Sequence, residues 1–263
     1  MITWASPDPT AIDWQYRATA NGGSTNNLHR DSADRLCKSL DSTGLASRMV
    51  EIYPFLGDDI PSICTKLFYS SAGSSQFSTS FNWASVHIVA FGGLKDAANS
   101  IRRINTNLTY ATALAGKESL TGIHWYTRDT AASGTSQVAV GSSVAGNNTV
   151  NGWVATGSKE TGLVATNAAY AVGTNVSAIG LHSACNFGVR TTQYLLNGVA
   201  MGGVSAAGSG SWATGTTYLF GNPAATYWKR DLLFVAITVG LTATEALTHS
   251  QVCKQFQQFL NRA

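Results

Sequence analysis

The chain has 263 residues, of which 17 are Lys or Arg and 14 are Asp or Glu, giving a formal net charge of +3. Charged residues make up 12% of the sequence, well below the ~25% usual in globular proteins. This composition argues against coiled coils, helix bundles and a nucleic-acid-binding surface. The apolar share of 44% argues against disorder. We therefore expect a protein made mainly of β-strands and turns.

No run of 18 uncharged apolar residues occurs, so no membrane-spanning helix is predicted. The first ten residues have neither a positive start nor an apolar core, and we expect no secretory signal there. The four cysteines, at 37, 64, 185 and 253, form no CxxC pair. They are interpreted as reduced, buried residues of a protein made in a cytosol, with disulfides as the alternative.

Residues 1–68 are predicted to form a helical N-terminal segment for attachment or packing. A first helix is expected to begin at Pro9 with Asp8 as its cap, because proline is favoured at the first helical position. A second helix is expected over residues 25–42, where apolar side chains recur at helical spacing, and a further turn or helix over 45–52. The segment is about half polar, so it is expected to pack on something else.

Residues 69–263 are predicted to form a β-domain that ends in a helix. Short β-branched runs alternate with Gly, Ser and Asn turns, a pattern typical of sandwiches and jelly rolls. Asn197-Gly198 lies between two apolar runs and predicts a two-residue hairpin turn. Thr242 and Glu245 form a predicted capping box for a last helix that ends near Leu260. Candidate strands lie at residues 85–91, 100–104, 108–114, 122–128, 136–140, 149–155, 178–181, 191–196, 217–220 and 231–238.

Five segments carry a resemblance to a known family. The stretch LLFVAITVGLTATE at 232–245 and the hairpin at 193–199 resemble the last strand, turn and hairpin of concanavalin A-like (laminin-G-like) jelly rolls. The stretches at 39–57, 124–128 and 256–262 are similar to segments of bacteriophage structural proteins that carry such a domain behind a short helical segment. Two positions depart from that pattern, since Asn261 stands where Gly is expected and Ala46 where Trp is expected.

This resemblance implies a mainly β fold, an antiparallel two-sheet jelly-roll sandwich with a helical N-terminal segment and a C-terminal helix. It further implies a non-enzymatic virion structural protein: a capsid decoration, spike or fibre subunit. Such a protein would be made in the host bacterial cytoplasm and exposed on the virion surface. The expected partners are other capsid or tail proteins, copies of the chain itself and host-surface carbohydrate, with no nucleic acid and no membrane. A lectin-like carbohydrate-binding module is the alternative function, and a glycan hydrolase the third.

Catalytic and metal-binding patterns are scarce in the sequence. Most glycosidases need two carboxylates, yet Glu160 is the only acid between residues 130 and 229. A GxSxG nucleophile elbow is absent. Asn147, Asn148 and Asn186 lack the acids that calcium sites usually add, and His182 with Cys185 supplies only two of the three or four ligands that zinc needs. We therefore expect no enzyme activity, no metal and no cofactor.

Aromatic residues are plentiful, with seven Trp and nine Tyr. Exposed rings beside Asn and Gly are suited to hold sugars, because the ring packs on the sugar face and amides bond its hydroxyls. Core packing or burial at subunit contacts is the alternative for each ring. Six aromatic residues of the β-domain are considered for this role: Trp125, Trp153, Trp212, Tyr218, Tyr227 and Trp228. The candidate glycan or contact residues are Asn151, Trp153, Trp212, Tyr227 and Trp228.

The N-terminal segment also concentrates aromatic residues within a short span. Large rings that a small segment cannot bury are typical contact anchors. The equally weighted alternative is that these rings fix the segment onto the sandwich. The candidate attachment residues are Trp4, Trp14, Tyr16, Tyr53 and Phe55.

Overall fold

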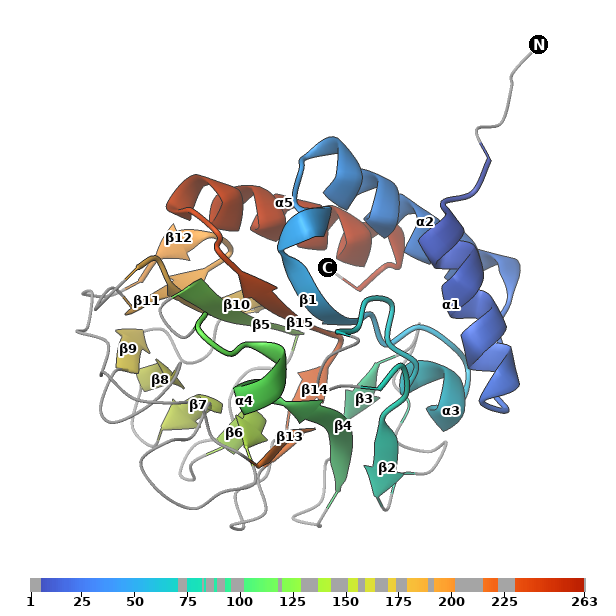
Figure 1. Cartoon of the computed structure of the whole chain (residues 1–263), viewed down its shortest axis with the longest axis horizontal. Helices are drawn as coiled ribbons and strands as arrows, with labels where there is room; N and C mark the ends of the chain where they lie inside the picture. The colour runs from blue at the N-terminus through green and yellow to red at the C-terminus, as the bar shows by residue number, and fades with distance from the viewer. Residues whose placement is uncertain are drawn as a thin grey trace.

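Three layers make up the described part of the chain: helices, a six-stranded sheet and a seven-stranded sheet (Figure 1). Every strand pair in these sheets is antiparallel, and the chain ends in a helix. The fold is thus mainly β with antiparallel sheets, as the sequence predicts. The computed structural model describes residues 6–70, 75–81, 83, 88, 93–95, 102–117, 120–128, 137–142, 151–155, 159–163, 170–173, 179–188, 192–201, 215–221 and 230–262.

The six-stranded sheet has strands from both ends of the chain side by side. The first and last strands of this sheet in the sequence, β1 and β15, pair with each other, and β15 then pairs with β5. In order across the sheet the strands are β1 (Met49–Tyr53), β15 (Phe234–Val239), β5 (Thr121–Thr127), β10 (Gly180–Asn186), β11 (Thr192–Leu196) and β12 (Val199–Ala200).

The seven-stranded sheet lies on the other side of the main core (Figure 1). A separate two-stranded ribbon joins β14 (Asp231–Leu232) to β3 (Leu94–Lys95). In order across the larger sheet the strands are β2 (Thr79–Phe81), β4 (Arg103–Thr109), β13 (Thr216–Leu219), β6 (Gln137–Ser142), β7 (Asn151–Ala155), β8 (Lys159–Leu163) and β9 (Tyr170–Gly173).

The helices begin where the sequence places their caps. Asp8 caps α1 (Pro9–Ala20) by accepting a hydrogen bond from the Thr10 N–H, and Thr242 and Glu245 form the capping box of α5 (Ala243–Phe259). Asn26 caps α2 (Asn27–Ser42) and forms a second capping box with His29. Two single turns, α3 (Ile60–Ile63) and α4 (Tyr110–Ala113), complete the set.

Two apolar cores hold the three layers together. The first lies between the sheets and joins Ile104 and Leu219 of the larger sheet to Ile123 and Val235 of the smaller one. The second lies between the helices and the outer face of the six-stranded sheet (Figure 1). One face of the six-stranded sheet is therefore covered by helices, whereas no helix of the described residues covers the outer face of the seven-stranded sheet.

The hairpin predicted at Asn197-Gly198 is confirmed. Both turn residues have positive φ, 51° and 79°, as a type I′ turn requires. Gly198 also lies against α5: a Cβ there would sit 2.8 Å from the Cα of Leu247. A side chain at this position would therefore be strained by both its backbone conformation and its neighbour.

Two stretches differ from the sequence prediction. Residues 45–52, expected as a turn or helix, form a 3₁₀ turn at Ala46–Arg48 and then β1, because pairing with β15 extends this segment at the sheet edge. Residues 108–114, expected as a strand, finish β4 at Thr109 and turn into α4. Of the predicted strand at 85–91, only residue 88 is described. The sequence does not predict β1, β2, β3, β8 and β9.

The predicted division at residue 68 does not mark a break in the packing. Strand β1 completes the six-stranded sheet, and Tyr53 and Phe55 belong to the core between the sheets. Ile52 and Leu67 belong to the core under the helices. The helical segment is thus built into the sandwich rather than attached to its outside.

Candidate functional site

The uncovered face of the seven-stranded sheet is the natural place to look for a binding surface. Along β4, burial alternates strictly, with Ile104, Thr106 and Leu108 buried and the residues between them half-buried. Because successive side chains of a strand point to opposite faces, Arg103 and Asn105 lie on the outer face. The same alternation in β13 puts Tyr218 on that face, since Thr217 and Leu219 are buried.

Tyr218 is the centre of the described part of this face. Its direct partners in the sheet are Asn105 on β4 and Gly141 on β6. The guanidinium carbon of Arg103 lies 5.6 Å from the centre of the Tyr218 ring, within the range of a cation–π contact. Gly141 has no side chain and is itself buried. The result is a half-buried ring beside an amide and a cation.

The polar side chains near Tyr218 are held in place by the main chain. The Asn107 N–H donates a 2.8 Å hydrogen bond to Oδ1 of Asn105, and Asn107 Nδ2 donates to the Phe77 carbonyl over 3.1 Å. Asn107 has a φ of 55°, and the pairing of β4 with β13 is irregular at this point. Asparagine tolerates this left-handed conformation better than most residues. Asn105 is therefore fixed in position before any ligand arrives.

One of the sequence-based glycan candidates falls in the same row of the sheet. Reading across the register from Tyr218, Gly141 pairs with Asn151 on β7, and Asn151 pairs with Leu163 on β8. Trp153 lies two residues further along β7 and pairs with Thr161. The other three candidates, Trp212, Tyr227 and Trp228, lie outside the described residues. Tyr218 itself was not among the glycan candidates chosen from the sequence. Only the strand register, which places it opposite Asn105 and Gly141, distinguishes it from the other aromatic residues.

The aromatic residues of the N-terminal segment are mostly core residues, which corrects their prediction as contact anchors. Trp14, Tyr53 and Phe55 are at most 1% exposed. Trp14 Nε1 donates to the Thr65 carbonyl over 3.2 Å, so even its polar atom is used internally. Tyr16 differs, with 74% of its surface exposed on α1. Trp4 lies outside the described residues.

A charged cluster lies in the interior beneath β4, away from this face. Lys66 Nζ donates to Oε1 of Glu51 over 2.8 Å and to the Thr106 carbonyl over 2.6 Å, and the Tyr53 hydroxyl donates to the same carboxylate. Both charged side chains are fully buried. Burial lowers the pKa of Lys66, and the neighbouring carboxylate opposes that shift. With no exposed surface, this pair serves structure rather than chemistry on a ligand.

A second polar cluster lies between the six-stranded sheet and α5. His124 bonds the hydroxyls of Ser183 and Thr238 over 2.8 Å each, and its ring centre lies 4.4 Å from that of His249. Burial lowers the pKa of both histidines, that of His249 to about 4, so both are neutral at pH 7. The ring contact between these two neutral, enclosed imidazoles packs the sheet against the helix.

The cysteines offer no reactive thiol. All four are free and buried. Burial raises the pKa of the Cys64 and Cys185 thiols to about 12 and that of Cys37 and Cys253 further still. Since the thiolate is the reactive form, these thiols are inert at neutral pH.

Within the described part of the chain, no three His, Cys, Asp or Glu side chains gather as metal ligands would. In the same residues, no helix is both long enough and apolar enough to cross a membrane.

Solved structures share the fold at low sequence identity. A Trypanosoma rangeli sialidase in complex with the inhibitor DANA superposes with a TM-score of 0.50 and 10% identity, covering 92% of this chain and 37% of that chain. A mutant of the same sialidase gives 0.49, with 10% identity and coverage of 85% and 39%. Domain 4 of AbnA, an extracellular arabinanase of Geobacillus stearothermophilus solved with arabinotriose, gives 0.47 and 10%, covering 78% and 98%. The chain thus spans about two fifths of the sialidases. No protein-family model matches the sequence, and no curated protein does.

These findings contradict the expectation of a bacteriophage virion structural protein. Of the structures described above, the one whose TM-score reaches 0.50 is a sialidase and not a virion protein. The sequence resemblance rested on short segments whose residues make structural contacts, such as the helix cap at Thr242. The virion partners and virion location depend on that resemblance alone, and we do not carry them further.

Proposed function

We propose that the protein is a non-catalytic carbohydrate-binding protein that holds a glycan on the outer face of the seven-stranded sheet. One observation carries the proposal: the half-exposed Tyr218 ring lies between Asn105 and Gly141 in the sheet register. A sugar ring can pack on the tyrosine face while its hydroxyls bond the amide of Asn105. The solved structure that the fold resembles is a sialidase in complex with the inhibitor DANA.

The row of residues through Tyr218 is long enough for more than one sugar. Asn151 lies two strands away from Tyr218 in that row, and neighbouring strands are ~4.8 Å apart. Trp153 is the next candidate along β7. Within this proposal the sandwich is a concanavalin A-like jelly roll, which is supported by the two antiparallel sheets and by strands of distant sequence position pairing in each.

The absence of catalysis is proposed from the distribution of acids in the sequence. Glu160 is the only Asp or Glu among the residues of the seven strands. Glycosidases generally need two carboxyl groups, one to donate a proton and one to act as base or nucleophile. A single acid on β8 cannot fill both roles, so binding without hydrolysis is the function that this face supports.

The test is a glycan array with the purified protein, followed by titration calorimetry on the glycans that bind. Tyr218→Ala should weaken binding about two- to tenfold, because a lost stacking contact is worth ~0.5–1.5 kcal/mol. Tyr218→Phe should retain most of the affinity, since the ring remains. Tyr16→Ala is the matched control: it removes an exposed tyrosine from α1 and should leave binding unchanged.

Two results would count against the proposal. Binding that is equal in wild type, Tyr218→Ala and Tyr16→Ala would place any glycan elsewhere on the molecule. Release of reducing ends from a bound glycan by the wild type would show that the protein is a hydrolase. The melting temperature of each variant should be measured beside the affinity, so that a folding defect is not mistaken for lost contact.

A further inference from the structure

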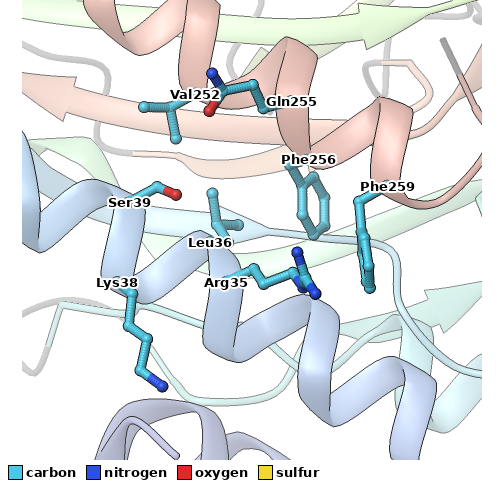
Figure 2. A pocket seen from close by; sticks show the side chains of 8 residues that line it. All are labelled: Arg35, Leu36, Lys38, Ser39, Val252, Gln255, Phe256 and Phe259. Atoms are coloured by element: carbon cyan, nitrogen blue, oxygen red, sulfur yellow. The ribbon is translucent and has the colours of Figure 1, made fainter. Parts of the chain in front are cut away.

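A second concave site lies on the opposite side of the molecule, between α2 and α5. Figure 2 shows Arg35 and Leu36 of α2 facing Phe256 and Phe259 of α5 across this site. Its floor is apolar and buried, made of Leu36 from α2 and Val252 and Phe256 from α5. The volume is about 250 Å³, below the ~300–1,000 Å³ of sites that hold drug-sized ligands. A space of this size suits one large apolar side chain rather than a glycan.

The rim of this pocket carries an uncompensated positive charge. The Arg35 guanidinium lies 4.1 Å from the centre of the Phe259 ring and is exposed. Lys38, next along the rim, is paired with Asp34 over 2.8 Å. Among the described residues no ion pair involves Arg35, so the pocket keeps one cation that a ligand could neutralise. Ser39 on α2 and Gln255 on α5 add neutral polar groups at the edge.

We propose that the pocket between α2 and α5 binds a partner protein's peptide segment in which a large apolar residue is followed by an acidic one. The apolar side chain fills the space over Leu36 and Phe256, and the acidic side chain pairs with Arg35. A guanidinium already stacked on a ring is held in one orientation, so it loses little freedom on meeting a carboxylate. The site is independent of the glycan face, from which the whole sandwich separates it.

Blocked dipeptides probe this chemistry directly. N-acetyl-phenylalanyl-glutamate amide is titrated into the full-length, isotope-labelled protein, and backbone amide shifts are followed by NMR. We expect shifts in α2 and α5 with a dissociation constant on the order of 1 mM, reasonable for so small a ligand. The glutamine analogue, which lacks the charge, should bind about tenfold more weakly. The alanine analogue, which lacks the ring, should not bind measurably.

The Arg35→Gln variant distinguishes specific binding in this pocket from non-specific binding elsewhere on the protein. It should bind the glutamate and glutamine peptides equally, because the residue that distinguishes them is gone. Arg30→Gln is the matched control, as Arg30 is on the same helix but is paired with Asp31 outside the pocket, and it should keep the tenfold preference. Equal binding of the two peptides by the wild type would overturn the proposal. So would shifts outside α2 and α5, or no shifts at tens of millimolar peptide.

Discussion

The side chain of Arg262 bonds the main-chain carbonyl of Phe55, 207 residues away: Nη2 donates to that oxygen over 2.8 Å. Nη1 donates to the Leu233 carbonyl over 3.2 Å. Arg262 is fully buried, and Phe55 has a left-handed φ of 49°, which a bulky residue rarely adopts. Two of the segments singled out in the sequence, around Tyr53-Pro54-Phe55 and at the last arginine, therefore meet in one contact that fixes the strained turn after β1.

Arg262→Met should lower the free energy of unfolding by roughly 2–4 kcal/mol, because it leaves buried carbonyl groups without a donor. Burial lowers the pKa of Arg262 to about 9, so the guanidinium is charged at pH 7. Urea unfolding of the purified variant measures the loss. Lys254→Met, at an exposed lysine of α5, is the control and should change stability by less than ~0.5 kcal/mol. Similar losses in both variants would show that the buried contacts are unimportant.

Asn261, at the position where the resemblance noted in the sequence predicts Gly, is in a left-handed conformation with a φ of 53°. The Arg262 N–H bonds back to the Gln257 carbonyl over 2.8 Å, as at a helix end closed by such a residue. Asn261→Gly should therefore be neutral or stabilising, and Asn261→Ala should cost about 1 kcal/mol. Thermal melts of both, with Gln258→Ala as an exposed control in α5, give the comparison. An alanine variant as stable as the glycine one would contradict this account.

The sequence predicted the elements whose signals are local. Asp8 with Pro9, and Thr242 with Glu245, define helix starts through bonds within four residues, and Asn197-Gly198 defines its own turn. Strand β1 was missed because its cause is distant. Its central residue, Glu51, carries a charge and would therefore be expected at the surface. In the structure Glu51 is fully buried, because Lys66 neutralises its charge.

The sequence predicted the residue types of the candidate site but not which residues form it. The composition indicates exposed aromatic rings beside Asn and Gly, and the structure has this arrangement at Tyr218. The choice of Tyr218 depends on Asn105, which is 113 residues earlier in the chain and is brought opposite by strand pairing. The spacing of residues along a single sequence does not show which residues strand pairing places opposite each other. Trp14 and Phe55 were predicted to be contact residues at the surface, but both are buried. The sequence alone does not show which residues pack over them.

Mild acid should destabilise the protein through the histidines under α5. The folded-state pKa of His249 is about 4, below the ordinary value of 6.5 expected when unfolded, and that of His124 is also lowered. The unfolded state therefore binds more protons below pH 6.5, and stability falls as pH drops from 6.5 toward 4. His249 alone should account for about 2 kcal/mol between pH 7.5 and pH 5. Urea unfolding at the two pH values measures this loss, and it should be smaller by that amount in His249→Gln. An equal loss in the variant would rule His249 out as the cause.

Breaking the buried pair of Glu51 and Lys66 from one side should be severe. Lys66→Met leaves a carboxylate with no cation in the interior and should cost about 3–5 kcal/mol. The double variant Glu51→Gln with Lys66→Met removes the charge, while the amide oxygen still accepts from the Tyr53 hydroxyl. It should be more stable than Lys66→Met alone in urea unfolding at pH 7. A double variant less stable than Lys66→Met alone would mean that the unpaired charge of Glu51 is not the main cause of the stability loss in Lys66→Met.

Removing residues 1–68 should abolish folding rather than release a stable sandwich. The deletion takes β1 from the edge of β15, and it removes Tyr53 and Phe55 from the core between the sheets. It also removes α2 from above the six-stranded sheet, exposing the apolar surface there. Near-ultraviolet circular dichroism of the 69–263 fragment should lack native signal. Adding the 1–68 peptide in trans should restore the signal, and the same peptide carrying Ile52→Asp, which puts a charge at a fully buried position, should not. A 69–263 fragment that shows native dichroism and unfolds cooperatively by itself would mean that the sandwich does not need β1 and that the segment is only an attachment.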